Sequence, residues 1–265
     1  MSYTNYYKKS GMFHASLPLI MHTRLDVLMF EKTENQLNKA WLEAKREIKR
    51  LEKIFNRFDR DSEVAKVNTD AQFRPVELSD EMWNMMTACR NLYVKTDGNF
   101  DVTLSAFQHL IFTEDTHSVQ FDKHGMFLDF GGIAKGYALN IIHEIIKKAD
   151  IQRALINFGD SSILAVGTHP HSESWSILSK HFSNSNELFI INLVDSSLSV
   201  SGNSPDSPNQ IYSPKNKDFV KENRIVAVVT DSPIEAEAIS TAWVASGEKE
   251  PAWFRNFEIR TQYSV

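Results

Sequence analysis

The segment Asp129–Gly136 reads Asp-Phe-Gly-Gly-Ile-Ala-Lys-Gly and carries the residues best suited to hold an anionic ligand. A glycine pair between a predicted strand and a predicted helix lets the backbone approach a ligand closely. The helix N-terminus offers free N–H groups that suit a phosphate, and Lys135 adds a full positive charge. Asp129 can accept hydrogen bonds from a ligand ring or hydroxyl. A tight turn without a ligand explains the glycines equally well, since the segment has neither the dinucleotide fingerprint nor the phosphate loop.

Glu237 and Thr241 form a second candidate site, because they are four residues apart on a predicted helix and share one of its faces. A carboxylate and a hydroxyl on one face can hold a hard cation such as Mg²⁺, together with water and a carbonyl oxygen. The alternative is a solvated acidic helix start, since Asp231 and Glu235 precede Glu237 closely.

Two further segments suit a polar or flat ligand. In Asn99–Thr103, the side chains of Asp101 and Thr103 alternate and so face the same way in an extended chain. A plain turn followed by a strand explains that segment as well. Phe58 precedes a polar loop and can stack on a flat ring, although its spacing also fits the apolar face of the preceding helix.

Other chemistries have less support. His169 and His171 lie in a segment rich in Pro and Ser, where we expect exposed loop histidines and not a ligand set. Ser161 and Ser162 lack the surroundings of a nucleophile elbow. A net charge of −5 gives no basic surplus for a nucleic-acid partner. The single cysteine, Cys89, excludes an intrachain disulfide and continues an apolar helical stripe, so we expect a buried thiol.

The elements that position these residues alternate irregularly, which favours an α+β fold over a doubly wound sheet. Helices are predicted after the capping box Thr33–Gln36, after Ser79, from about Ile133 to Lys148, and after Ser232. Apolar runs predict strands at 19–30, 126–130, 154–158, 162–167, 175–178, 187–194, 197–201 and 225–230, and 57–68 is predicted to be a polar loop. With 42% hydrophobic residues the chain can bury a large core, so we expect an N-terminal tail at 1–17 and a single domain over 18–265.

No segment approaches the roughly 18 consecutive apolar residues that a membrane-spanning helix needs. The apolar run 17–21 is too short for the core of a signal peptide. We therefore expect no transmembrane segment and a cytoplasmic protein, or an exported one if a leader has been removed.

Taken in order from about Leu19 to Gly247, these segments resemble the ApbE-like FAD:protein FMN transferases. The most specific stretch is Asp129–Tyr137, DFGGIAKGY, which is close to the family's Asp-Leu-Gly-Gly-Ile-Ala-Lys-Gly-Tyr. Shorter matches flank it in sequence order at Met21-His22-Thr23, Phe55–Asn68, Gly98–Thr103, Ala154–Gly159, Ser201-Gly202 and Ala236–Ala242. The resemblance implies an ApbE/T-fold-like architecture of mixed, largely antiparallel sheets with packed helices.

The resemblance also implies a site for FAD and Mg²⁺. FAD would be surrounded by Met21, Phe58, Asn99, Phe100, Asp101, Asp129, Lys135 and Ser201, with Phe58 in the place of the aromatic residue that stacks on the isoalloxazine. Mg²⁺ would be held by the carbonyl oxygen of Gly132 with Glu237 and Thr241, and would neutralise charge on the phosphates. The implied reaction is attack of a Ser or Thr hydroxyl of an acceptor flavoprotein domain on the FAD pyrophosphate, which leaves FMN in a phosphoester bond and releases AMP.

Asp160 stands where the family has a second Gly after Gly159, and the stretch between Thr103 and Asp129 is shorter than usual. Three further departures bear on the chemistry. Gln210 stands where the family commonly has the histidine of His-x-x-Asp-Pro, the expected proton acceptor, and an amide cannot titrate for that role. Ser213 replaces the Asp of the same motif, and Glu237 is one methylene longer than the usual Asp. Three hypotheses follow: Mg²⁺-dependent FMN transfer, flavin-nucleotide binding by a homologue that has lost transfer, and a slow FAD pyrophosphatase.

Overall fold

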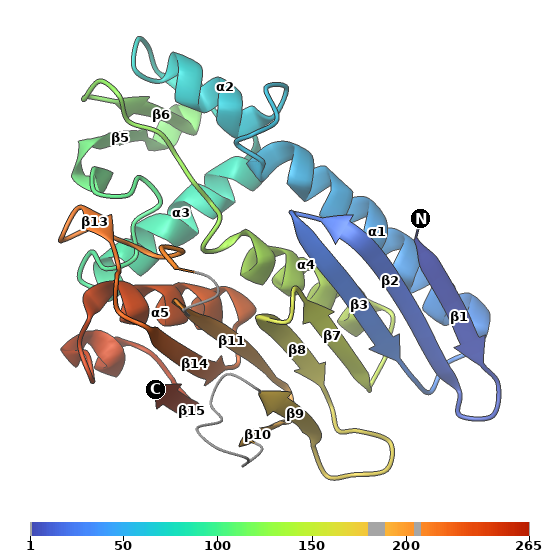
Figure 1. Cartoon of the computed structure of the whole chain (residues 1–265). Helices are drawn as coiled ribbons and strands as arrows, with labels where there is room; N and C mark the ends of the chain where they lie inside the picture. Colours follow the sequence, from blue (N-terminus) through green and yellow to red (C-terminus); the bar gives the residue numbers. More distant parts are fainter. Residues whose placement is uncertain (1, 180–188, 204–207, 265) are drawn as a thin grey trace.

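Eight strands form one large sheet in this computed structural model, which describes residues 2–179, 189–203 and 208–264. The strands follow the order β1 (Tyr3–Tyr7), β2 (Met12–Ile20), β3 (Thr23–Met29), β7 (Ala154–Phe158), β8 (Ser162–Val166), β11 (Ser196–Asn203), β14 (Arg224–Thr230) and β15 (Thr261–Ser264). Every strand pairing in the described part of the chain is antiparallel. Because β1 and β15 are the two edges, the chain termini lie at opposite ends of the sheet (Figure 1).

Helices pack on one face of this sheet. The α-helices of the described residues are α1 (Glu34–Phe55), α2 (Glu63–Asp70), α3 (Asp80–Lys95), α4 (Ala134–Lys148) and α5 (Pro233–Ser246). Short 3₁₀ helices lie at Phe107–His109, Glu114–Thr116 and Ala252–Asn256. α1 contacts β2, α4 contacts β7 and β8, and α5 contacts β8, β11 and β14. Among the described residues, no helix has both the length and the apolar character needed to cross a membrane.

Three smaller sheets complete the fold. They are formed by β4 (Val76–Glu77), β6 (Ser118–Phe121) and β5 (Leu110–Thr113), by β10 (Phe189–Leu193) and β9 (Trp175–Ser179), and by β12 (Tyr212–Ser213) and β13 (Asp218–Phe219). Figure 1 shows β9 and β10 in front of the large sheet, on the face opposite the helices, and β5 and β6 beside α2 at one end of the molecule.

The core has two parts because successive side chains of a strand point to opposite faces. On β14, Val226 and Val228 belong to the large cluster beneath the helices. Ala227 and Val229 belong to a second cluster, which Trp175 of β9 closes on the opposite face. The predicted α+β class with packed helices and antiparallel sheets is thus confirmed.

The predicted helix starts are also confirmed. Thr33 and Gln36 form the complete capping box, in which the Gln36 N–H donates to Thr33 Oγ1 at 3.4 Å and the Thr33 N–H to Gln36 Oε1 at 3.1 Å. Ser79 Oγ accepts the Met82 N–H at 3.2 Å and caps α3. Ser232 caps α5, with Pro233 as its first helical residue.

The N-terminal segment differs from the prediction, because most of residues 1–17 are not a tail but form β1 and the first part of β2. Phe13, Ala15 and Leu17 are buried, and the polar positions between them are less so, which is the period of two of a half-buried strand. The predicted strand 19–30 is divided by a turn at Met21-His22, which joins β2 to β3.

Three local predictions were wrong. Residues 126–130 are in no strand among the described residues, and the Asp129 N–H instead donates to the carbonyl oxygen of Val102 at 2.7 Å. The polar loop 57–68 contains the start of α2. Phe58 does not continue the apolar stripe of α1, because α1 ends at Phe55, and its ring is 68% exposed. Of the predicted strand 187–194, residues 187 and 188 lie outside the described residues.

Candidate functional site

The segment Asp129–Gly136 makes a sharp corner that leads into α4. Asp129 turns its own side chain back on the chain, and Oδ1 accepts the N–H of Gly131 at 2.9 Å. The N-cap of α4 is Ile133, whose side chain cannot cap the helix. The first N–H groups of α4 therefore need partners from outside the helix.

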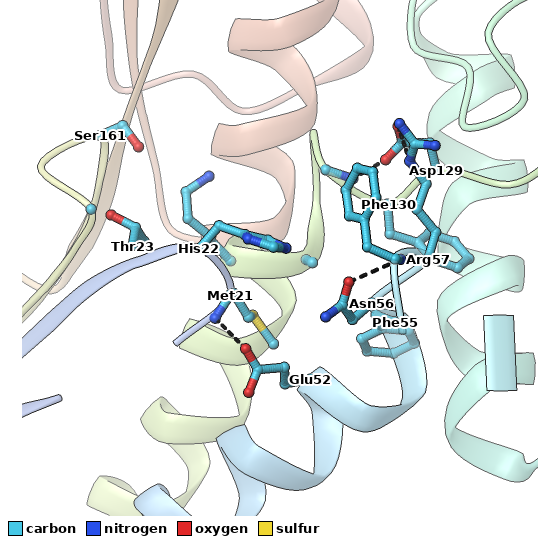
Figure 2. Close-up of a pocket in the computed structure, with 15 residues that line it drawn as sticks. Met21, His22, Thr23, Glu52, Phe55, Asn56, Arg57, Asp129, Phe130 and Ser161 are labelled. Atoms are coloured by element: carbon cyan, nitrogen blue, oxygen red, sulfur yellow. Dashed lines mark hydrogen bonds and ion pairs between the residues drawn. The ribbon is translucent and has the colours of Figure 1, made fainter. Parts of the chain in front are cut away.

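A cavity of about 250 Å³ opens on one side of this corner, and we name it the turn cavity because the β2–β3 turn forms one wall. The end of α1 forms another wall, with Glu52, Asn56 and Arg57. Figure 2 shows Glu52 beside Met21 and, across the cavity, Arg57 beside Asp129.

The turn wall is held in an unusual backbone conformation. Met21 has φ 47° and His22 has φ 64°, both in the left-handed region. Glu52 Oε1 accepts the Met21 N–H at 2.7 Å and so ties the turn to α1. The His22 ring meets the Phe58 ring edge to face, with centroids 5.6 Å apart. Phe58 therefore lies at the mouth of the turn cavity.

A second cavity of about 340 Å³ lies on the other side of the corner, and we name it the hairpin cavity because the β12–β13 hairpin lines it. Tyr212 and Phe219 contribute from the hairpin, and the 99–104 segment lies opposite. The two cavities share three residues: Arg57, Asp129 and Gly131.

The boundary between the cavities carries an ion pair. Arg57 Nε lies 2.9 Å from Asp129 Oδ2. The same guanidinium lies over the ring of Phe58, with its carbon 4.3 Å from the ring centroid. A cation thus stands at the point where the turn cavity and the hairpin cavity meet.

Asn99 provides an unpaired acceptor in the wall of the hairpin cavity. Its side chain is buried, and Nδ2 donates to the carbonyl oxygen of Thr96 at 2.9 Å. Its Oδ1 has no hydrogen-bond partner among the described residues. An unpaired buried acceptor costs free energy, and this oxygen lies beneath the surface of the cavity wall.

Asp101 is held by its own segment. Oδ1 accepts the Thr103 N–H at 2.7 Å and the Thr103 hydroxyl at 2.6 Å, and Oδ2 accepts the Phe107 N–H at 3.3 Å. Burial raises the pKa of this carboxyl, and these hydrogen bonds offset part of the increase. These contacts tie Asp101, which lines the hairpin cavity, to the backbone of Thr103 and Phe107.

Glu237 lies behind the corner, where its carboxylate is only 2% exposed. Oε1 is paired with Lys135 Nζ and accepts the Ser162 hydroxyl at 3.3 Å. Oε2 accepts the N–H of Gly136 in the first turn of α4. Both oxygens of the predicted metal ligand are therefore engaged by the protein itself.

The other two predicted metal ligands do adjoin each other. A methyl group on Gly132 would lie 3.5 Å from Thr241 Oγ1. Ser201, from β11, links this pair to a chain of hydroxyls, with Oγ 3.4 Å from Thr241 Oγ1 and 2.8 Å from Ser240 Oγ. Among the described residues, no group of three His, Cys, Asp or Glu side chains is arranged to hold a metal. With Glu237 occupied, the residues present do not fit an open Mg²⁺ site.

The structure brings together most of the predicted site residues. The turn cavity is lined by Met21, Phe58, Asp129 and Lys135, and the hairpin cavity by Asn99, Phe100, Asp101, Asp129, Gly132, Gln210 and Thr241. Ser201 and Glu237 are not among the residues that line either cavity. Sequence reasoning missed Arg57, whose only signal is its place between two aromatic residues in FNRF.

Comparison with known proteins identifies the family that this chain resembles. The model of the ApbE family matches this chain over residues 21–118 and 104–262. The FAD:protein FMN transferase of Chlamydia muridarum is 25% identical over 181 residues, which is 58% of this chain and 55% of that protein. The FAD:protein FMN transferase of Chlamydia trachomatis is 25% identical over 228 residues, 74% of this chain and 68% of that protein. This chain thus spans little more than half the length of the first relative.

Solved structures show the same fold. The flavin transferase ApbE from Vibrio cholerae is 16% identical and superposes with a TM-score of 0.78, over 90% of this chain and 88% of that chain. The ApbE protein of Thermotoga maritima is 20% identical, also with a TM-score of 0.78, over 92% of this chain and 89% of that chain. With the family match over nearly the whole sequence, the chain belongs to the ApbE family.

Proposed function

We propose that this protein binds FAD across the two cavities and transfers FMN to a Ser or Thr hydroxyl of an acceptor flavoprotein domain. The observation that carries the proposal is the pair of cavities that meet at Arg57 and Asp129, beside Lys135 at the start of α4. FAD has two flat ring systems joined by a pyrophosphate. One ring in each cavity places the pyrophosphate at the boundary, where Arg57 lies, with Lys135 in the wall of the turn cavity.

Each cavity has a feature that suits a ring. At the turn cavity, the exposed Phe58 ring offers a face for stacking. At the hairpin cavity, Asn99 Oδ1 is unpaired just behind the wall, and a small turn of this side chain on ligand binding would offer the oxygen to a ring N–H. These two contacts, one apolar and one polar, support binding of a dinucleotide over binding of a simple anion.

In the proposed reaction, the acceptor hydroxyl oxygen forms a bond to the phosphorus on the flavin side of the pyrophosphate. The bond from that phosphorus to the bridging oxygen breaks, and AMP leaves with the bonding electron pair. Arg57 and Lys135 would stabilise the charge that develops on the phosphate oxygens. The hydroxyl proton passes to the phosphate of the leaving AMP or to solvent, because the amide of Gln210 cannot accept it. Since the ligands expected for Mg²⁺ do not form an open site, no step here runs through a metal.

The second candidate is a flavin-nucleotide-binding homologue without transfer activity. Gln210 favours it, because this amide lines the hairpin cavity where the family's pattern has a proton acceptor. Ser213, at the second replaced position, is 2% exposed and presents no carboxylate. A slow FAD pyrophosphatase is the third candidate, with water in place of the acceptor hydroxyl.

One experiment separates these candidates. The protein is incubated with FAD and an acceptor domain, with and without Mg²⁺, and covalent FMN is detected by in-gel fluorescence and mass spectrometry. An acceptor whose hydroxyl residue is replaced by alanine is the control. Transfer predicts FMN on the intact acceptor alone, and AMP release without an acceptor indicates the pyrophosphatase.

Binding without transfer predicts retained FAD with neither product. In that case the double variant Gln210→His, Ser213→Asp is expected to start transfer. A protein that retains no FAD under any of these conditions would contradict all three candidates.

A further inference from the structure

Both carboxylate oxygens of Glu237 have partners, which come from two other elements. Lys135 and Gly136 come from the first turn of α4, and Ser162 from the start of β8. Lys135 is 102 residues away in the sequence from Glu237, so the fold alone creates this pairing. A buried carboxylate is stable only when its charge is compensated, and here Lys135 supplies one full positive charge.

The α4 N-terminus is shaped around this carboxylate. A methyl group on Gly136 would lie 2.9 Å from Glu237 Oε2 and 2.6 Å from the carbonyl oxygen of Pro233. Only glycine at this position lets α4 and α5 approach closely enough for the Gly136 N–H to reach Oε2. The N–H also lies at the positive end of the α4 dipole, which favours an anion there. The side chain of Glu237, which is one methylene longer than the Asp of the family's pattern, is therefore held against the first turn of α4.

Lys135 also faces the proposed ligand. Its side chain is 20% exposed and lines the turn cavity. An ammonium group has three N–H donors. With one of them directed to Glu237, the others are free to meet an anion in the turn cavity.

We propose that Lys135 takes the place of a divalent cation at this corner, so that the pyrophosphate of a flavin nucleotide binds here without Mg²⁺. The inference rests on the proposed function for the identity of the ligand. A dication at Glu237 would have to displace the Lys135 ammonium or bind beside it, and two cations on one buried carboxylate repel each other. Mg²⁺ also demands near-octahedral oxygen ligands, and Glu237 is the only carboxylate in the predicted set.

Two measurements test this inference. The first is Mn²⁺ binding to the protein without nucleotide, followed by electron paramagnetic resonance, and we expect no stoichiometric site. The second is FAD affinity by quenching of flavin fluorescence, in EDTA and in excess Mg²⁺. We expect dissociation constants in the two media that agree within about twofold.

Variants that remove the charge of Lys135 test the same inference. Lys135→Met is expected to weaken FAD binding about tenfold or more in both media. Because this variant leaves Glu237 without its partner, Lys135→Met with Glu237→Gln removes both charges and is expected to fold and to show the same loss of affinity. The control is Lys95→Met, because Lys95 also pairs with a glutamate of α5, Glu235 at 2.9 Å, but lines neither cavity. Its FAD affinity should equal that of the wild type.

The outcomes separate the inference from the function on which it rests. FAD affinity that rises about tenfold or more with Mg²⁺ would overturn the inference and leave flavin binding intact. So would a stoichiometric Mn²⁺ site that Glu237→Gln abolishes. If FAD does not bind in either medium, the proposed function fails, while the Mn²⁺ measurement still decides whether Glu237 is a metal ligand.

Discussion

Arg57 Nε lies 2.9 Å from Asp129 Oδ2, at the one boundary that the turn cavity and the hairpin cavity share. The two side chains are 35% and 25% exposed, so we expect this ion pair to contribute at most about 1 kcal/mol to stability. Asp129 in turn orders the corner by accepting the Gly131 N–H. The pair therefore joins the end of α1 to the start of α4 at the position proposed for the pyrophosphate.

Replacing Arg57 by methionine tests that position. We expect Arg57→Met to weaken FAD binding about tenfold, because a cation beside the phosphates is lost, and to change the free energy of unfolding by less than about 1 kcal/mol. Flavin fluorescence titration and urea denaturation measure the two quantities. Arg90→Met is a closely matched control, since Arg90 is also 35% exposed, pairs with Glu114 and lies over the ring of Phe112, but lines neither cavity. Equal FAD affinity in the Arg57 variant and the wild type would contradict the placement.

Replacing Asn99 by alanine tests the unpaired acceptor. The change removes Oδ1 from the hairpin cavity, so FAD affinity should fall about tenfold. The free energy of unfolding should change by less than about 1 kcal/mol, since the lost hydrogen bond to Thr96 is offset by removal of an unpaired buried oxygen. The control is Thr87→Val, which removes another buried, unpaired oxygen outside the two cavities and should leave FAD affinity unchanged. A large loss of stability without a loss of affinity would make Asn99 a structural residue only.

Local sequence signals predicted α1, α3, α4 and α5 because caps act within a few residues, but the shorter α2, which Ser62 caps in the same way, was missed. The Thr33 capping box and the caps at Ser79 and Ser232 depend only on contacts three residues along the chain. The strand prediction for 126–130 failed for the opposite reason. Met126, Leu128 and Phe130 are buried, but the backbone of the segment pairs with Val102 of a loop and with the side chain of Asn68. No periodicity in the sequence reveals which backbone groups will pair.

The candidate site was predicted in part. The glycine corner and its lysine are adjacent in the sequence, so their types were informative before the fold was known. The state of Glu237 was not predictable, because it depends on Lys135 and Ser162, which are 102 and 75 residues away. The spacing that placed Phe58 on the apolar face of the preceding helix was misleading. Asn56 caps the end of α1 and accepts the Phe58 N–H, so the helix stops before Phe58.

The raised pKa of Asp101 predicts a dependence of stability on pH. The folded state binds this proton more tightly than the unfolded state, so the stabilisation is complete below the ordinary aspartate pKa of about 3.9 and is lost as the pH rises through the folded pKa. The excess stability of the wild type over Asp101→Asn, measured by urea denaturation, should therefore decrease as the pH rises from about 4 to about 7.

Asp150 provides a control, because its pKa is shifted in the opposite direction to that of Asp101. The hydrogen bond from Lys32 lowers the pKa of the exposed Asp150. Its stabilisation is present above the ordinary aspartate pKa and is lost as the pH falls through the lowered value. The excess stability of the wild type over Asp150→Asn should therefore increase as the pH rises to about 4, in a series extended to lower pH, and stay level between about 4 and about 7. If the Asp101 series has the same sign as the Asp150 series, the carboxyl of Asp101 is stabilised in its charged form, contrary to this prediction.

Gly136 gives the sharpest test of the contact between α4 and α5. In a helix interior, alanine is more stable than glycine by up to about 1 kcal/mol, so Gly136→Ala would stabilise an isolated α4. In the folded protein its methyl group would lie 2.6 Å from the carbonyl oxygen of Pro233, a backbone atom that cannot move alone, so we expect a net loss of about 1–2 kcal/mol. Gly132→Ala is the comparison, because its methyl group would meet a side-chain atom of Thr241 at 3.3 Å, a longer contact with no backbone atom involved. Its loss of stability should therefore be smaller. Urea denaturation measures the free energy of unfolding of both variants. A Gly136→Ala protein as stable as the wild type would mean that Glu237 does not pack against the first turn of α4.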